Sequence, residues 1–230
     1  MRMVNSTLRV SLLAIGAVLI AGCAPTATMN SDLPTVTEDG LKLVPAKNVD
    51  ALYWRDGATL QPYTAVKLVE CTVAFKKDWM RNQNQNRSSV TTRVRPEDME
   101  RIKAALSTRF NEEFTKVLEK GGYKVVAEGG EDVLTLRPAI INLDVTAPDL
   151  RTAGMTQTYT TSAGEMTLYV ELYDSATGAR IGQAVDRQRA IDRGYITYTN
   201  SVTNTAEANR ILRKWAGLLV DALDEAKVQQ

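Results

Sequence analysis

The sequence predicts an α+β fold in which an antiparallel sheet of about four or five strands carries two long helices. Two patterns lead to this prediction: apolar residues that alternate with polar ones indicate strands, and apolar residues spaced three or four apart indicate helices. The predicted order is β-α-β-β-β-β-α. The sequence contains no internal repeat of the length found in solenoid proteins. We therefore expect a single domain over residues 49–230.

The first predicted strand covers residues 64–76. Val69, Cys71, Val73 and Phe75 alternate with polar residues, so this face should turn toward the core and take the Cys71 thiol with it. Residues 77–95 contain almost no apolar side chain, and we expect a long exposed loop there.

Two segments show a helical apolar stripe. The first begins at Pro96, which suits the first helical position, and ends at Gly121-Gly122. The second covers about 206–227, with Asn204 and Glu207 spaced as in a capping box. The two stripes consist of Met99, Ile102, Leu106, Phe110, Phe114, Val117 and Leu118, and of Ile211, Leu212, Trp215, Leu218, Leu219, Ala222 and Leu223.

The remaining strands lie between the helices. A short strand is expected near 123–127 and a long one near 133–146, where Pro138 predicts a bulge or an edge position. After a second loop at 147–163, a hairpin follows with arms at 165–173 and 180–191. Residues 193–205 should connect the hairpin to the last helix.

The N-terminus carries the clearest targeting signal. Arg2 and Arg9 precede the apolar stretch Val10–Cys23, which is short of the roughly 20 residues of a spanning helix. Its end, Leu-Ile-Ala-Gly-Cys, resembles a bacterial lipobox. The resemblance implies that residues 1–22 are a signal peptide and that Cys23 is acylated, with residues 23–48 as a flexible tether. Ala24 in the next position favours the outer membrane, with the domain in the periplasm.

Composition argues against most enzyme classes. The chain has no histidine, and its 28 basic residues nearly balance 27 acidic ones. The commonest general base and zinc ligand is therefore missing, and no basic excess favours nucleic acid. Common nucleotide-binding, nucleophile and metal motifs are absent from the sequence as well. We expect a non-enzymatic protein without cofactor or metal.

Basic and aromatic residues in the loops form the candidate interaction surface. Four arginines with no acidic residue among them could meet an acidic partner, cell-wall polymer or anionic lipid, although a solvated loop has the same composition. The candidates are Arg81, Arg87, Arg93 and Arg95, together with Tyr195, Tyr198 and Tyr159. Asp186, Arg187 and Arg189 read either as paired surface charges on an edge strand or as an anion-binding strip. Tyr169 and Tyr173 are expected on the outer face of the hairpin.

The C-terminal half resembles a known family. The segments concerned are Gly164-Glu-Met-Thr-Leu168, Glu171-Leu-Tyr-Asp-Ser-Ala-Thr-Gly178, Ala184-Val-Asp-Arg187 and Lys214-Trp-Ala-Gly-Leu-Leu219. They resemble the bacterial lipoprotein family called domain of unknown function 3313, and residues 82–95 depart from its pattern. A weaker similarity connects the chain to periplasmic lipoproteins of envelope assembly. Neither resemblance implies catalytic residues.

These observations favour a tethered periplasmic module that binds another envelope protein. The alternative is a carrier in which a small envelope ligand, a lipid or a glycan, is held between the helices and the sheet. A hydrolase is the weakest option, because the adjacent Glu112 and Glu113 cannot share one helix face.

Overall fold

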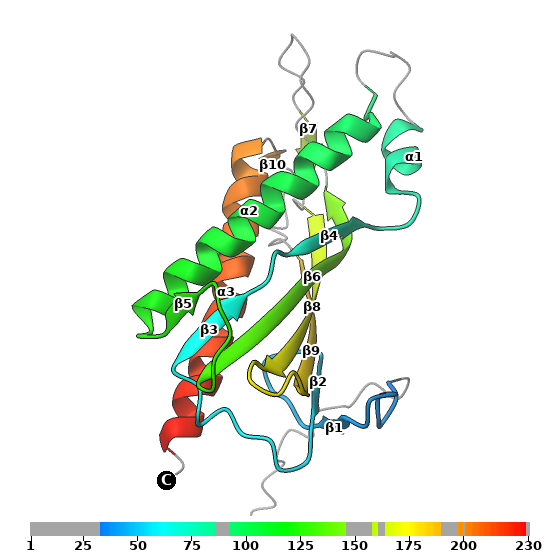
Figure 1. Ribbon diagram of the computed structural model, residues 1–230. Helices are drawn as coiled ribbons and strands as arrows, with labels where there is room; N and C mark the ends of the chain where they lie inside the picture. Colours follow the sequence, from blue (N-terminus) through cyan, green and yellow to red (C-terminus); the bar gives the residue numbers. More distant parts are fainter. Residues whose placement is uncertain are drawn as a thin grey trace, which may run out of the picture.

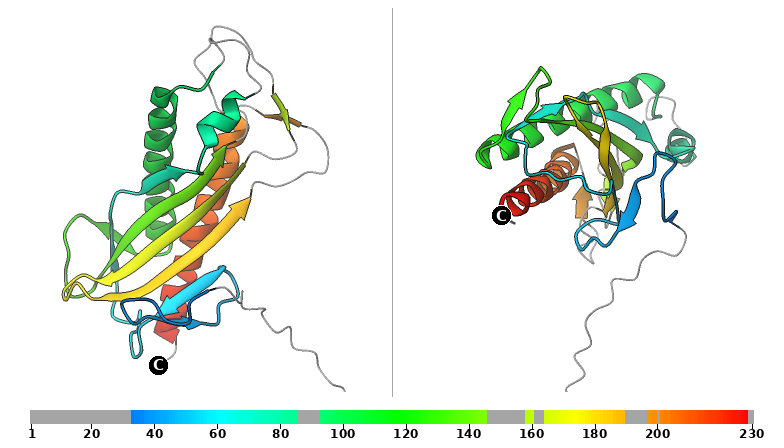
Figure 2. Two further views of the ribbon diagram at one scale, coloured as in Figure 1. Left: turned by 90° about the vertical axis from the view of Figure 1, so that its right-hand side faces the viewer. Right: turned by 60° about the horizontal axis from the view of Figure 1, so that its bottom comes forward.

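The computed structural model describes residues 33–85, 93–145, 158–160, 164–189, 197–199 and 201–228, with the backbone alone at 158–160, 197–199 and 201–204. This part of the chain forms two layers. The long helices α2 (Pro96–Lys120) and α3 (Ser201–Val228) lie on one face of a twisted sheet (Figure 1). Figure 2 shows the other face of the sheet turned away from both of them.

The main sheet has eight strands and is mostly antiparallel, so the α+β class is confirmed but the expected four or five strands are too few. Seven strands follow the order β1-β2-β9-β8-β6-β3-β5, and β4 pairs with β6 beyond the end of β3. The strands are β1 (Lys42–Val44), β2 (Ala51–Trp54), β3 (Ala65–Leu68), β4 (Thr72–Phe75), β5 (Lys124–Val126), β6 (Val133–Val145), β8 (Gly164–Asp174) and β9 (Arg180–Arg189). A separate two-stranded sheet joins β7 (Thr158–Thr160) to β10 (Thr197–Thr199).

Three of the strand pairs are parallel, which the sequence pattern did not indicate. β3 lies between β5 and β6 and is parallel to both, and β4 is parallel to β6. For β3 and β5 the cause is α2, since a helix that carries the chain back along the sheet delivers the next strand in the same direction. The predicted hairpin is confirmed, with β8 and β9 antiparallel along their length.

The single strand predicted at 64–76 is in fact two strands, and this break accommodates Pro138. The Leu136 carbonyl accepts a hydrogen bond from the Val69 N–H at 3.0 Å. Backbone groups two residues apart in a strand point to the same side, so the backbone of Pro138 also faces the side of β3 and β4. It lies at the gap between these two strands, where neither of them pairs with β6. Its missing N–H therefore removes no ladder bond. The irregularity in β6 lies later, between Ile141 and Asp144, rather than at the proline.

The core lies between the helices and the sheet. The apolar stripe of α2 is confirmed, with Phe110, Phe114 and Leu118 buried and the two phenyl rings stacked at 4.0 Å. From α3, Leu212 and Trp215 are also buried in it. Each such side chain stabilises the fold by roughly 1.5–3 kcal/mol relative to exposure. α3 begins at Ser201, so Asn204 lies within the helix and is not its cap.

The domain begins before residue 49. Leu41, fully buried, packs with Ala51 and Tyr53, and the Leu43 N–H donates to the Thr35 carbonyl at 2.9 Å. Residues 33–48, expected as part of a flexible tether, thus contribute β1 and a small second core. The apolar positions Leu41 and Leu43 are too few to stand out among the Thr, Pro and Asp residues around them.

A short helix, α1 (Trp79–Asn84), lies where the sequence suggested only loop. Trp79 is buried and its ring stacks on Phe75 at 4.2 Å. A single apolar anchor in a run of Asn, Gln and Arg gives no helical period, which explains why composition suggested a loop. No helix in the part of the chain described here is long and apolar enough to cross a membrane.

Candidate functional site

A row of hydrogen-bonded polar side chains lies on the sheet face that the long helices leave uncovered. Glu171 is at its centre and accepts hydrogen bonds from the Tyr169 hydroxyl (3.1 Å) and the Tyr173 hydroxyl (2.9 Å). Arg180 forms an ion pair with the same carboxylate. The Arg137 guanidinium lies over the Tyr173 ring, 4.4 Å from its centre. The row is thus fixed by its own contacts.

Both tyrosines are protonated donors at neutral pH. Burial raises the pKa of Tyr169 to about 12, and the neighbouring Glu171 carboxylate adds to the effect. The pKa of Tyr173 is raised for the same two reasons, burial first. The outward position expected for both residues is correct, and each one hydrogen-bonds to Glu171 between them.

Arg180 also connects this row to the N-terminal segment. Its guanidinium contacts Asp39 as well as Glu171, and its side chain is only 13 % exposed. In addition, the Arg55 Nε donates to the Arg180 carbonyl at 2.7 Å. Residues 33–48 are therefore held to the sheet by charge as well as by the burial of Leu41.

An open groove of about 530 Å³ continues from this row toward the β8–β9 turn. Its floor and walls come from β3, β6, the turn before β6 and the turn after β8. The lining includes two basic, two acidic and several small residues: Lys67, Val69, Gly129, Gly130, Glu131, Thr135, Arg137, Tyr173, Asp174, Ser175, Ala176 and Gly178. Ligand pockets commonly have 300–1,000 Å³, so the volume is in range.

The two turns of the groove touch each other. A Cβ atom added at Gly129 would lie 2.4 Å from the Ser175 Oγ, so a larger residue here would force the Ser175 hydroxyl to turn away. Ser175 in turn shares a hydrogen bond of 2.9 Å with the Thr135 hydroxyl. Asp174 accepts from the Thr177 N–H and from Tyr63, and the Thr177 contacts hold the pKa of its carboxyl below the usual range. The groove is therefore a shaped feature of the fold.

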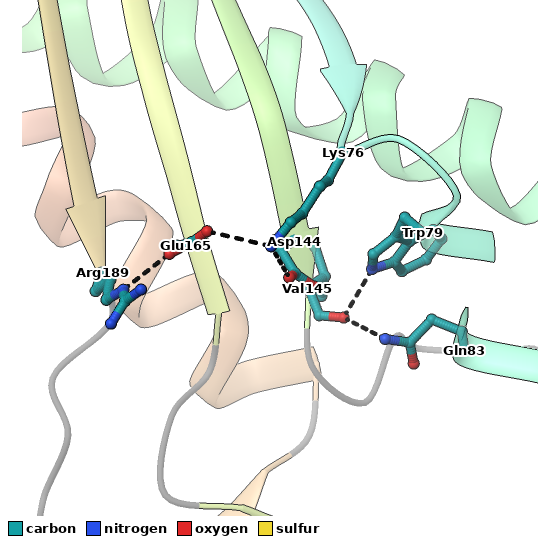
Figure 3. Close-up of polar contacts among 7 residues, drawn as sticks. All are labelled: Lys76, Trp79, Gln83, Asp144, Val145, Glu165 and Arg189. Atoms are coloured by element: carbon teal, nitrogen blue, oxygen red, sulfur yellow. Dashed lines mark hydrogen bonds and ion pairs between the residues drawn. The ribbon is translucent and has the colours of Figure 1, made fainter. Parts of the chain in front are cut away.

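The opposite end of the sheet carries α1 and most of the described arginine candidates. Figure 3 shows the Val145 carbonyl accepting from the Trp79 indole (3.2 Å) and from the Gln83 amide (3.4 Å). At the C-terminal side of α1, the Asn84 amide bonds both the N–H and the carbonyl of Val94. These contacts fix α1 to the end of β6 and to the start of α2.

Ion pairs continue across the same strand ends. Lys76 lies 3.3 Å from Asp144 and 3.6 Å from Glu165, and Arg189 donates to Glu165 at 2.8 Å (Figure 3). The Arg189 hydrogen bond lowers the pKa of Glu165. Charges of alternating sign thus connect the ends of β4, β6, β8 and β9.

The structure brings three of the predicted arginines to this end. Arg81 is on α1, with its side chain 70 % exposed and paired with Asp78 at 3.1 Å. Arg93 is exposed, and Arg95 precedes α2, where its N–H donates to Asp98 at 3.0 Å. The β7–β10 pair lies at the same end in Figure 1 and sets Tyr198 opposite Tyr159. We call this region, defined by α1, residues 93–95 and the β7–β10 pair, the α1 end. Cys23, Arg87 and Tyr195 lie outside the described residues.

The expectation that Asp186 forms part of a charged surface strip is wrong. Its side chain is buried, and its Oδ2 accepts from the Trp215 indole and from the Gln188 amide, both at 2.7 Å. Arg187 and Arg189, in contrast, are exposed. The strand alternation was correct, but it could not tell which of the two faces α3 covers.

Cys71 is a core residue, as the alternation predicted. It is buried, and burial raises the pKa of its thiol to about 12, which keeps it in the unreactive form. Within the residues that the structure covers, no group of three or more His, Cys, Asp or Glu side chains is placed to hold a metal ion.

Comparison with known proteins defines the class to which the chain belongs. The family model described as "Protein of unknown function (DUF3313)" matches residues 39–219. The chain therefore belongs to this family, and the resemblance noted in the sequence is confirmed. The match begins before β1, consistent with the N-terminal segment being part of the domain. No curated protein matches the chain.

Several solved structures show a distant likeness. A minor lipoprotein from Acinetobacter baumannii is 9 % identical, with 69 % of this chain and 91 % of that chain covered and a TM-score of 0.33. A Xanthomonas campestris protein of family DUF330 is 12 % identical over 76 % and 94 % of the two chains, with a TM-score of 0.38. A PelC dodecamer from Paraburkholderia phytofirmans is 13 % identical over 71 % and 95 %, with a TM-score of 0.31. These similarities are too low to assign a role to this chain.

Sequence reasoning missed the groove. Lys67, Glu131 and Arg137 come from separate segments, and none of them stands in a recognisable motif. Only the turn residues at 129–130 and 174–178 gave a signal, and each was explained by a turn. The pairing of β3 with β6 brings the groove together, and that parallel pair was not predicted.

Proposed function

We propose that the protein is a lipoprotein of the outer membrane, anchored by acylated Cys23, whose α+β domain binds another envelope protein in the periplasm and has no catalytic activity. The α1 end is the contact surface. One observation supports this most: the fold gathers Arg81, Arg93 and Arg95 at the end of the molecule opposite the β1–β2 end, where the described N-terminal segment packs (Figure 1).

The position and chemistry of this surface suit an acidic protein partner. Arginine is enriched at protein interfaces because its guanidinium binds carboxylates through paired hydrogen bonds. α1 is held by Trp79 and Asn84 at its two ends, so Arg81 and Arg93 are presented on a fixed support. An anchor on the N-terminal side would leave this end free to reach into the periplasm.

The α1 end can be tested by changing its charge in the anchored protein. We expect the triple change Arg81→Gln, Arg93→Gln and Arg95→Gln to abolish the crosslinked envelope partner in cells, because three cations leave the interface. Glutamine keeps the helix propensity of α1. The matched control changes Lys116, Lys120 and Lys124, three exposed lysines elsewhere, to Gln. Equal crosslinking by both variants would exclude the α1 end as the contact surface.

The anchor is tested separately. Cys23→Ser removes the acylation site, so we expect a stable domain that no longer sediments with membranes, since a lipid chain is what holds such a protein at the bilayer. Fractionation after high-salt and carbonate washing measures this. A variant that still sediments with membranes would refute the lipid anchor.

A second candidate function is a carrier for a small envelope ligand, and the groove is the observation in its favour. The ligand would not lie between the helices and the sheet as first expected, because Phe110, Phe114, Leu134 and Trp215 fill that region. It would lie on the uncovered face of the sheet. Mass spectrometry of the natively purified protein would detect such a ligand as added mass.

A further inference from the structure

The groove beside the β8–β9 turn is lined by two basic side chains, Lys67 and Arg137. Lys67 on β3 lies opposite Thr135 of β6, two residues before Arg137 on the same face. Arg137 contacts the Tyr173 ring, and in the described part of the chain neither cation forms an ion pair with a carboxylate. Two cations on neighbouring strands that line one groove can both contact a single bound anion.

Two carboxylates also line the groove. Glu131 is exposed and, among the described residues, forms no ion pair. Asp174 is held by Thr177 and Tyr63, and its lowered pKa keeps it charged. The groove therefore offers two cations and two carboxylates and has little net charge, which fits a small ligand that carries both an anionic and a cationic group.

Hydroxyl groups and backbone favour phosphate as the anionic group. The Thr135 and Ser175 hydroxyls lie 2.9 Å apart within the lining, next to the backbone of Gly129 and Gly130. Arg, Lys, hydroxyls and backbone N–H groups are the usual donors to phosphate oxygens. A carboxylate has fewer oxygens and would leave some of these donors unused.

We propose that this groove binds the phosphoethanolamine headgroup of a membrane lipid. Lys67 and Arg137 bind the phosphate, and Glu131 binds the ammonium group. The choice of a membrane lipid rests on the proposed anchor. Leu33, where the described domain begins, is ten positions after Cys23, so the domain begins within about 35 Å of the acylated residue. The β8–β9 turn and β1 lie at the same end of the molecule (Figure 2).

The headgroup can be tested on the full-length acylated protein in an uncharged maltoside detergent by isothermal titration calorimetry. The probes are glycerophosphoethanolamine, glycerophosphoglycerol (phosphate without amine) and alanylalanine (a zwitterion without phosphate). We expect saturable binding of glycerophosphoethanolamine, at least tenfold tighter than that of the other two. This assay needs no membrane, so its failure would leave the anchor and the α1 end unaffected.

Variants assign the roles of the side chains. Lys67→Gln and Arg137→Gln, singly and together, should weaken glycerophosphoethanolamine binding, with a loss of tenfold or more in the double variant. Glu131→Gln should weaken it while leaving glycerophosphoglycerol binding unchanged. Lys116→Gln and Glu119→Gln, exposed positions on α2, are the matched controls and should bind as the unchanged protein does. The single variants test the proposal if the double variant does not fold.

A second measurement separates a membrane lipid from a free headgroup. In lipid nanodiscs, hydrogen exchange at residues 129–135 and 174–178 of the acylated protein should be slower with phosphatidylethanolamine present than with phosphatidylglycerol alone. Three results would overturn the proposal: no saturable binding, equal binding of alanylalanine, or unchanged binding by the double variant. Equal exchange in both nanodiscs would overturn the membrane lipid as the source.

Discussion

The Asp186 carboxylate joins strand β9 to helix α3 through the Trp215 indole, at a donor–acceptor distance of 2.7 Å. Both side chains are buried, and Gln188 donates to the same oxygen of Asp186. A buried polar group that loses its partner costs free energy, because water cannot replace the missing hydrogen bond. This pair therefore fixes the position of α3 on the sheet more specifically than apolar contacts do.

We expect Asp186→Ala to lower the free energy of unfolding by about 1–3 kcal/mol, since the Trp215 N–H is then buried without an acceptor. Asp186→Asn keeps an acceptor and should cost less. Urea denaturation followed by tryptophan fluorescence measures both variants. Arg187→Ala, an exposed neighbour on the same strand, is the control and should change stability little. Equal stability of Asp186→Ala and the unchanged protein would contradict this role.

The ion pairs at the ends of β4, β6, β8 and β9 should make stability depend on pH. The pKa of Glu165 is lower in the folded state because of Arg189, so the unfolded chain binds a proton more readily. The stabilisation is complete above the unfolded pKa, about 4.3, and is lost as the pH falls through the lower folded value.

We therefore expect the free energy of unfolding to fall less between pH 6 and pH 3 in Glu165→Gln than in the unchanged protein. Glu119→Gln, an exposed position on α2, should retain the full pH dependence. Denaturation curves at several pH values check this, and the same slope in both variants would show that Glu165 does not contribute.

At the scale of elements, helix α1 depends on one side chain. Trp79 is the buried residue of α1, and it both stacks on Phe75 and donates to the Val145 carbonyl. An isolated six-residue helix is not stable in water, so tertiary contacts must hold it.

Trp79→Ala should release α1 from the end of β6. We expect a loss of about 3–5 kcal/mol, typical of removing a buried tryptophan, and faster hydrogen exchange at residues 79–84. Gln83→Ala removes a hydrogen bond of 3.4 Å to the same carbonyl but leaves the Trp79 ring in place, and should have a smaller effect. Unchanged exchange in Trp79→Ala would mean that other contacts hold the helix.

The elements with a complete pattern were predictable and the others were not. Seven apolar residues at helical spacing defined α2, and a long alternation with a turn defined β8 and β9. β1 has three residues and α1 has one buried residue, which is too short a pattern for either period to show. The gap between β3 and β4 follows from pairing with β6, a contact that is distant in the sequence.

On the scale of the whole molecule, the proposed anchor would place the two ends of the domain at different distances from the bilayer. At most about 35 Å of chain separates the proposed anchor at Cys23 from the β1 end of the domain. A flexible tether over all of residues 23–48 would have allowed a separation of about 80 Å. α3 has 28 residues and is about 42 Å long, so the α1 end can lie far from the bilayer. The sequence identified the arginines of that end, but only the fold shows which of them lie together.

Site-specific photocrosslinking in cells tests this arrangement most directly. A photoreactive amino acid at Arg93, on the α1 end, should give a crosslink to a discrete envelope protein in the anchored chain, and the same group at Lys124, at the edge strand β5, should not. The Arg93 crosslink should also disappear in Cys23→Ser, because the domain is then no longer held at the membrane. Equal crosslinking from both positions, or none from Arg93, would contradict the account.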